Sequence, residues 1–135
     1  MEKQKKILDA SVLVKWFAKE EYSDKALKLK QEHLLGKSLL IIPDLTILEV
    51  MNSLRYKDND EKILKRANED ILNLQIKIER INKYLVDKAV EISYKYKITI
   101  YDAIYVALAQ MHGCFLVTAD KELFKIPNVV SIENI

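Results

Sequence analysis

Short apolar runs alternate along the chain with segments in which apolar residues recur at helical spacing. Such runs predict strands at residues 5–9, 39–42 and 114–117. Segments 76–80 and 129–132 also predict strands, and the first of them alternates with a period of two. Five strands separated by longer periodic segments are typical of an α/β protein.

Helical periodicity fills the segments between these strands. The predicted helices cover residues 11–19, 23–35, 44–56, 61–74, 82–96, 99–112 and 120–124. Gly36 and Gly113 follow two of them, where glycine commonly ends a helix. Strands that are apolar on both faces and alternate with helices predict a parallel sheet covered on both sides.

The composition indicates one soluble domain that spans residues 1–135. Half of the residues are hydrophobic, which is enough to fill a core. No apolar run approaches the 18 or so residues that span a bilayer. No signal-peptide pattern follows the basic N-terminus, and the single cysteine, Cys114, fits a reducing cytoplasm. The net charge of +2 is too small to predict nucleic-acid binding by itself.

Four acidic residues interrupt these apolar segments: Asp9, Glu49, Asp102 and Asp120. A buried carboxylate must be paired, hydrogen-bonded or bound to a cation. The sequence places no Lys or Arg in an equally apolar context, so the four acids predict a shared metal site. Asp9 and Asp120 follow strands, and sites in parallel sheets form at the carboxyl ends of strands.

Each acid also has a simpler interpretation. Asp9 and Asp120 could cap the helices that follow them. Asp102 has the spacing of a capping box with the threonine three residues earlier. Glu49 could be a buried core residue that is hydrogen-bonded to Asn52 or to a backbone amide.

A cluster of these acids would favour a hard divalent cation. Two carboxylates about 4 Å apart repel by roughly 4 kcal/mol at an effective dielectric constant near 20. A ligand set made only of oxygen favours Mg²⁺ or Mn²⁺ over zinc. Such an ion activates water for attack on a phosphodiester.

The acids and their apolar neighbours resemble those of the PIN-domain ribonucleases, and most of all the VapC-type toxins of toxin–antitoxin pairs. The resemblance covers essentially the whole chain. The segments that carry it are Ile-Leu-Asp9-Ala-Ser11-Val-Leu, Leu-Glu49-Val-Met-Asn52, Tyr-Asp102-Ala-Ile-Tyr-Val-Ala-Leu-Ala and Leu-Val-Thr118-Ala-Asp120-Lys-Glu-Leu-Phe.

This resemblance implies a three-layer α/β/α fold with a central, mostly parallel sheet. It also implies Mg²⁺- or Mn²⁺-dependent endoribonuclease activity on RNA, a homodimer and a VapB-like antitoxin as partner. By position, the implied metal-site acids are Asp9, Glu49, Asp102 and Asp120, with Ser11, Asn52 and Thr118 supporting the site.

The chain departs from the family pattern at two positions near the acids. Many relatives have Thr at the position of Ala10 or Arg at the position of Ala119, and these changes remove no ligand. Glu122 is a candidate for the additional acid that often lies near the fourth one.

Two other functions stay open at this point. One is a catalytically silent PIN-like binding module. The other is a receiver-like signalling domain, but Ala10 and Ser11 replace the second acid expected after the first strand. The strand at 39–42 also lacks the terminal Asp that a phosphoacceptor requires.

Overall fold

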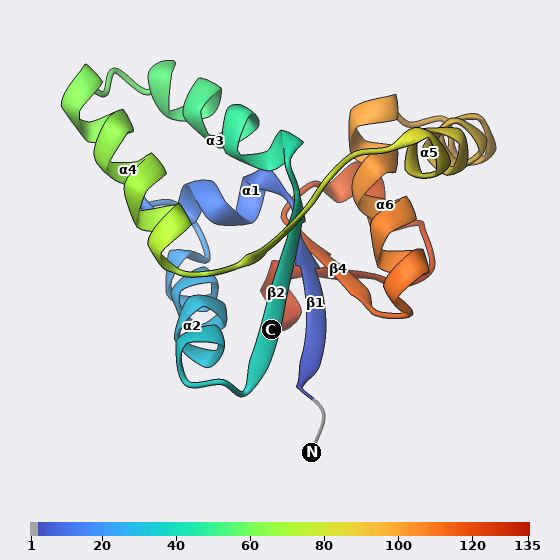
Figure 1. Cartoon of the computed structure of the whole chain (residues 1–135), viewed down its shortest axis with the longest axis horizontal. Helices are drawn as coiled ribbons and strands as arrows, with labels where there is room; N and C mark the ends of the chain where they lie inside the picture. Colours follow the sequence, from blue (N-terminus) through green and yellow to red (C-terminus); the bar gives the residue numbers. More distant parts are fainter. Residues whose placement is uncertain (1–2) are drawn as a thin grey trace.

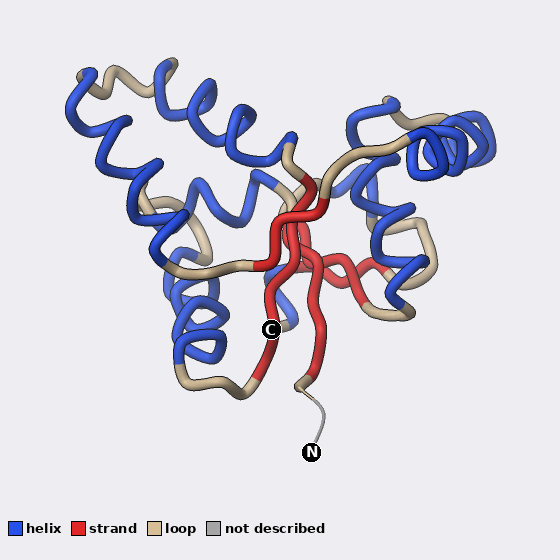
Figure 2. Tube along the Cα trace, viewed as in Figure 1, coloured by secondary structure: helices blue, strands red, loops and turns tan. Residues whose placement is uncertain are grey.

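A five-stranded sheet lies between two layers of helices in the computed structural model, which describes residues 3–135 (Figures 1 and 2). The strands are β1 (Gln4–Leu8), β2 (Ser38–Pro43), β3 (Lys77–Glu79), β4 (Phe115–Thr118) and β5 (Val129–Ser131). Their order in the sheet is β3-β2-β1-β4-β5, and every pairing is parallel. The predicted three-layer α/β/α fold is therefore confirmed. Receiver domains have the different order 2-1-3-4-5, which contradicts that alternative.

The helices follow the predicted pattern closely, except over residues 11–19 and over residues 120–124, where only a 3-10 turn forms. They are α1 (Ala10–Leu13), α2 (Ser23–Leu34), α3 (Leu45–Arg55), α4 (Glu61–Asn73), α5 (Lys83–Tyr96) and α6 (Ile100–His112), with the 3-10 turns η1 (Val14–Trp16), η2 (Lys121–Leu123) and η3 (Ile132–Asn134). Within residues 3–135, no helix combines the length and the apolarity needed to cross a membrane.

The prediction of one continuous helix over residues 11–19 is wrong. The α-helix ends at Leu13 and continues only as the 3-10 turn η1. The hydroxyl of Ser23 donates to the Ala18 carbonyl at 3.2 Å and accepts from the Glu20 amide at 2.9 Å. The Ala18 carbonyl and the Glu20 amide, which a longer helix would pair internally, therefore bond to the first residue of α2.

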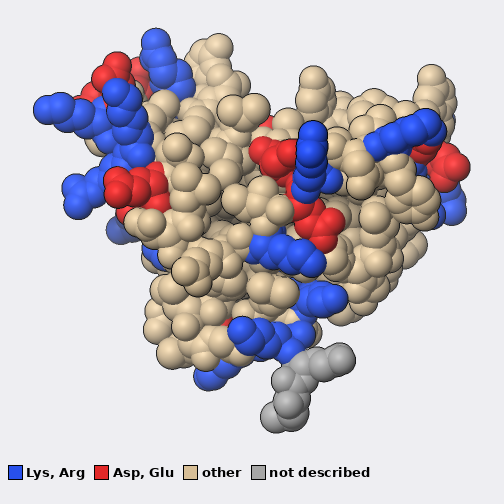
Figure 3. Space-filling view, in the orientation of Figure 1, with Lys and Arg blue, Asp and Glu red and all other residues tan. Residues whose placement is uncertain are grey.

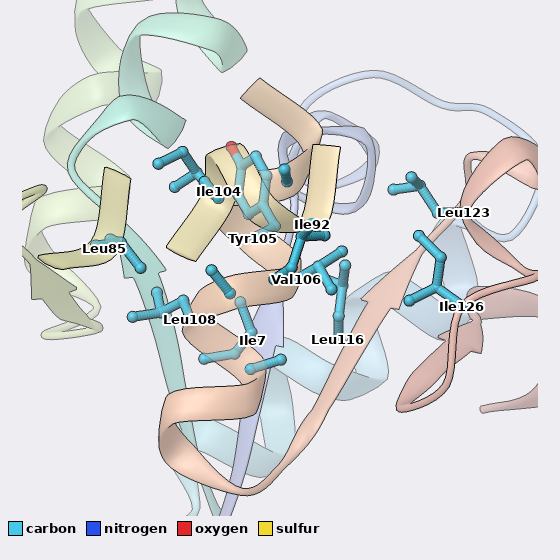
Figure 4. Close-up of a cluster of buried hydrophobic side chains, with 14 of the residues drawn as sticks. Ile7, Leu85, Ile92, Ile104, Tyr105, Val106, Leu108, Leu116, Leu123 and Ile126 are labelled. Atoms are coloured by element: carbon cyan, nitrogen blue, oxygen red, sulfur yellow. The ribbon is translucent and has the colours of Figure 1, made fainter. Parts of the chain in front are cut away.

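Each face of the sheet has its own apolar core, because successive strand residues point to opposite faces. On β1, Ile7 packs with α5 and α6, whereas Leu8 packs with α1 to α4. Figure 4 shows the first of these clusters, which is centred on α6. Residues 103–109 of α6 are all buried, so this helix is fixed firmly against the sheet.

The parallel pairing brings distant segments together at one edge of the sheet. β1 and β4 are neighbours, and Leu8 pairs with Val117. Asp9 therefore follows β1 beside Thr118, the last residue of β4. The first turn of α6, which carries Asp102, and the helix α3, which carries Glu49, complete this region.

Candidate active site

Asp9 is the most deeply buried of the four acids, with 5% of its surface exposed. Ser11 Oγ donates to its Oδ1 at 2.5 Å, and Thr118 Oγ1 donates to its Oδ2. Asp9 occupies the N-cap position of α1, but its side chain makes no capping hydrogen bond. Its two oxygens are held by the hydroxyls instead, although the amide of Val12 in α1 also acts to lower its pKa.

The two hydroxyls are held so that their protons point at Asp9. Ser11 Oγ accepts the amide N–H of Ala119 at 3.1 Å, and Thr118 Oγ1 accepts that of Asp120 at 3.0 Å. With an oxygen lone pair occupied in this way, each hydroxyl directs its own hydrogen to the carboxylate. The loop after β4 thus fixes the orientation of a side chain at the end of β1.

Glu49 is half-buried on α3, and its partner is a residue that the sequence did not suggest. The hydroxyl of Tyr105 donates to Glu49 Oε1. It also lies 3.0 Å from Thr46 Oγ1, and since its single proton goes to the carboxylate, Thr46 is the donor there. The expected bond to Asn52 is absent: its side chain is exposed and makes no hydrogen bond within residues 3–135.

Tyr105 lies three residues after Asp102 and therefore on the same side of α6. Its ring is buried in the core, and its hydroxyl projects from the end of the cluster (Figure 4). The sequence could have indicated that Tyr105 bonds to a polar partner, because it lies in a run of small and aliphatic residues and a buried phenol normally finds a hydrogen-bond partner.

Asp102 lies in the first turn of α6, whereas Asp120 caps the 3-10 turn η2 with its side chain. Thr99 caps α6 by accepting the Asp102 amide at 3.1 Å, so the threonine half of the predicted capping box forms. Asp120 accepts the Glu122 amide at 3.0 Å and caps η2, which confirms the simpler interpretation of that residue. This bond occupies Oδ1 only, and the second carboxylate oxygen of Asp120 remains available for another ligand.

The four acids influence one another electrostatically, with Asp102 at the centre. Burial raises the pKa of Asp102, and the charges of Asp120 and Glu122 raise it further. Burial likewise raises the pKa of Glu49. The hydrogen bond from Tyr105 acts to lower this pKa, and the charge of Asp102 acts to raise it further. Like charges gathered in a partly buried place produce this pattern.

Asp9 shows the largest effect of this kind. Burial raises its pKa to about 6, although the hydrogen bonds from Ser11 and Thr118 act in the opposite direction. The charge of Asp102 contributes to the rise. Carboxyl groups with raised pKa values that gather at the end of a sheet are candidates for a functional site.

The acids are near one another but do not form a closed cage. Among residues 3–135, no three His, Cys, Asp or Glu side chains lie close enough to hold one ion as they are placed. The prediction that no Lys or Arg is as deeply embedded as the acids is wrong, because Lys15 is buried with 8% of its surface exposed. Its ion pair, however, is with Glu20 and not with any of the four acids.

Comparison with known families decides the classification. The family model for the PIN domain matches residues 6–129, which is most of the chain. The chain belongs to the PIN domain family. Among curated proteins, a sequence comparison finds no match.

Solved structures share the fold of this PIN domain over nearly its full length. A toxin–antitoxin complex from Klebsiella pneumoniae contains a chain that is 24% identical, with a TM-score of 0.73 over 93% of this chain and 96% of that one. The PAE2754 protein of Pyrobaculum aerophilum is 26% identical, with a TM-score of 0.72 over 97% and 85% of the two chains. The Mycobacterium tuberculosis toxin VapC20, which cleaves the sarcin-ricin loop, is 13% identical, with a TM-score of 0.67 over 84% and 87%.

The raised pKa of Asp9 predicts a specific dependence of stability on pH. Its pKa rises from 3.8 to about 6, so the folded protein binds more protons than the unfolded chain between these values. The contribution of Asp9 to stability is therefore lost as the pH rises through this window, by about 3 kcal/mol. Asp9→Asn abolishes this titration.

We expect the unfolding free energy of Asp9→Asn, relative to the native protein, to increase by up to about 3 kcal/mol between roughly pH 4 and pH 8. Denaturant unfolding in EDTA measures this difference, and fixed losses caused by the substitution cancel from the pH dependence. Asp70→Asn, at an exposed position on α4, is the control. A difference that stays constant with pH would contradict the assignment.

Removal of the Tyr105 hydroxyl should destabilise the fold, because it leaves Thr46 and Glu49 without their shared partner. We expect Tyr105→Phe to lower the unfolding free energy by about 1–3 kcal/mol. Tyr101→Phe is the matched control, since Tyr101 lies on the same helix and is 63% exposed. Equal stabilities of the two variants would show that the Tyr105 hydrogen bonds contribute nothing.

Proposed function

We propose that this PIN domain is a Mg²⁺- or Mn²⁺-dependent endoribonuclease and the toxin of a VapBC-type toxin–antitoxin pair. The observation that carries the proposal is the convergence of Asp9, Glu49, Asp102 and Asp120 on one edge of the sheet. The charge of Asp102 raises the pKa values of Asp9 and Glu49, and the charge of Asp120 raises that of Asp102. None of the four acids is paired with a Lys or Arg in residues 3–135.

The residues present fit such a metal ion. Their donor atoms are all carboxylate oxygens, which Mg²⁺ and Mn²⁺ prefer. Mg²⁺ keeps several waters and commonly uses only one or two protein carboxylates, so an open arrangement of acids is compatible with it. When bound, the ion would activate water and stabilise the charge that develops on a phosphodiester.

The remaining side chains act by fixing the acids. Ser11 and Thr118 hold both oxygens of Asp9, and Tyr105 holds one oxygen of Glu49. These bonds leave the Oε2 of Glu49 without a hydrogen-bond partner in residues 3–135. The bonds to Asp9 support the proposed role of Ser11 and Thr118, whereas the exposed Asn52 makes no side-chain hydrogen bond in residues 3–135 that would support its role.

The structural neighbours support the toxin assignment as a proposal. The similar chains come from a toxin–antitoxin complex of Klebsiella pneumoniae and from VapBC complexes of Rickettsia felis and Salmonella typhimurium that were solved with DNA. A VapB-like antitoxin, a homodimer and a cytoplasmic location follow as parts of the same proposal.

Metal-dependent cleavage is tested with a panel of labelled RNAs in Mg²⁺, Mn²⁺ or EDTA. We expect cleavage only with a metal ion, and a loss of more than about 100-fold in Asp102→Asn, since changes outside the ligand shell already cost 10- to 100-fold. Asp70→Asn is the control. Cleavage that persists in EDTA would contradict the metal mechanism, and a folded protein that cuts no RNA would favour a silent binding module.

The toxin assignment is tested by expression in a bacterial host. The native protein should slow growth, Asp102→Asn should not, and the product of an adjacent small reading frame should bind the protein and restore growth. Size-exclusion chromatography of the purified complex measures the binding and the expected dimer. Unimpaired growth and no bound neighbour would overturn the toxin assignment, while the nuclease assignment would rest on the RNA panel alone.

A further inference from the structure

Lys15 is a buried cation that the acidic site does not explain. It lies in η1, four residues after Ser11, and only 8% of its surface is exposed. A buried ammonium group must be paired, because the loss of its hydration is costly. Its carboxylate partner is Glu20, with Lys15 Nζ 3.4 Å from Glu20 Oε1. This distance exceeds the 2.7–2.9 Å or so of a good charge-assisted hydrogen bond.

Glu20 does not neutralise Lys15 fully, because it is shared with a second cation. Lys57 Nζ lies 2.7 Å from the other oxygen of Glu20, which is the shorter of the two contacts. Burial alone would raise the pKa of Glu20, but the hydrogen bond from Lys57 and the charges of Lys15 and Lys57 outweigh it and lower that pKa. Two ammonium groups and one carboxylate leave a net charge of +1.

This charge borders an open pocket of about 220 Å³ between the first helical turns and α3. The pocket is lined by Ala10, Ser11, Val14, Lys15, Glu20 and Ser53. It has room for several waters, each of which takes about 30 Å³ in the liquid. Lys15 and the hydroxyl of Ser53 can supply hydrogen-bond donors to the oxygens of an anion. The carboxylate of Glu20 also lines the pocket, and the ion pair with Lys57 offsets its charge.

Ser11 joins this pocket to the acidic cluster. Its side chain lines the pocket, and its hydroxyl donates to Asp9. An RNA strand whose reacting phosphate lies at the acids must place a neighbouring phosphate close by. The acids themselves repel those neighbouring phosphates, so an adjacent cation is needed to hold the strand.

We infer that the pocket lined by Lys15 and Ser53 binds a backbone phosphate of the RNA next to the phosphate that is cut. This inference rests on the proposed endoribonuclease function. Lys15 acts here as a substrate-binding residue, and its partial pairing with Glu20 keeps the ammonium in place when no RNA is bound. A contact to phosphate carries no base specificity, so the effect should be similar for RNAs of different sequence.

Lys15→Met tests the subsite, because it removes the charge at a similar side-chain length. We expect KM for RNA cleavage to rise by about tenfold, the loss of one hydrogen bond to a charged group, while kcat changes little. The slope of log affinity against log salt, measured by fluorescence anisotropy on labelled RNA in EDTA, should become shallower by about 0.7. Lys15→Gln serves as a second variant if Lys15→Met folds poorly, as judged by its melting temperature.

Lys83→Met is the control, since Lys83 is an exposed lysine on α5 that pairs with Asp87 and does not line the pocket. Its salt slope and KM should stay at the native values. Equal effects of the two variants, or an unchanged KM and slope in folded Lys15 variants, would overturn the subsite. Weaker binding of an antitoxin peptide with unchanged RNA affinity would also overturn it, in favour of a protein carboxylate as the occupant. If the native protein neither binds nor cuts RNA, the proposed function itself fails.

Discussion

The buried carboxylate of Asp9 is the constraint on which the site depends. It is held at the end of β1 by hydroxyls from Ser11 and Thr118, and the two hydroxyls are oriented by the amides of Ala119 and Asp120. This arrangement requires β1 and β4 to be neighbours with parallel register, which the apolar cores on both faces of the sheet enforce. The sheet thus serves as the frame that brings one acid and its two donors together.

The burial of the Asp9 carboxylate destabilises the folded protein electrostatically. The hydrogen bonds to Asp9 do not compensate for its burial, and Asp102 adds repulsion to both Asp9 and Glu49. Functional sites commonly reduce the stability of the fold that carries them. A divalent cation would relieve the repulsion, so the same carboxylates that weaken the free protein would give it affinity for metal. Lys15 lies beyond this cluster and, with Glu20 and Lys57, forms a separate group of opposite net charge.

Local patterns in the sequence predicted most of the fold and suggested the four acids of the candidate site. The fully apolar strands, the glycines after α2 and α6, and the motifs around Asp9 and Asp102 all carry short-range signals. Long-range partners were not predictable in this way. The bond from Tyr105 to Glu49 joins residues 56 positions apart, on helices that belong to different cores, and only the complete fold brings the two side chains together. The burial of Lys15 was missed for a related reason, since a lysine at the end of a short helical turn is usually solvated.

Proton release on metal binding is a direct test of whether Asp9 binds the metal ion. Calorimetric titration of the protein with Mn²⁺, in two buffers of different ionisation enthalpy, gives the number of protons released. With a pKa of about 6 for Asp9, we expect this residue to contribute near half a proton at about pH 6, a contribution that falls toward zero near pH 8 and that is lost in Asp9→Asn. Binding with no proton release at about pH 6, or with the same release in Asp9→Asn, would contradict the claim that the buried carboxylate of Asp9 is a metal ligand.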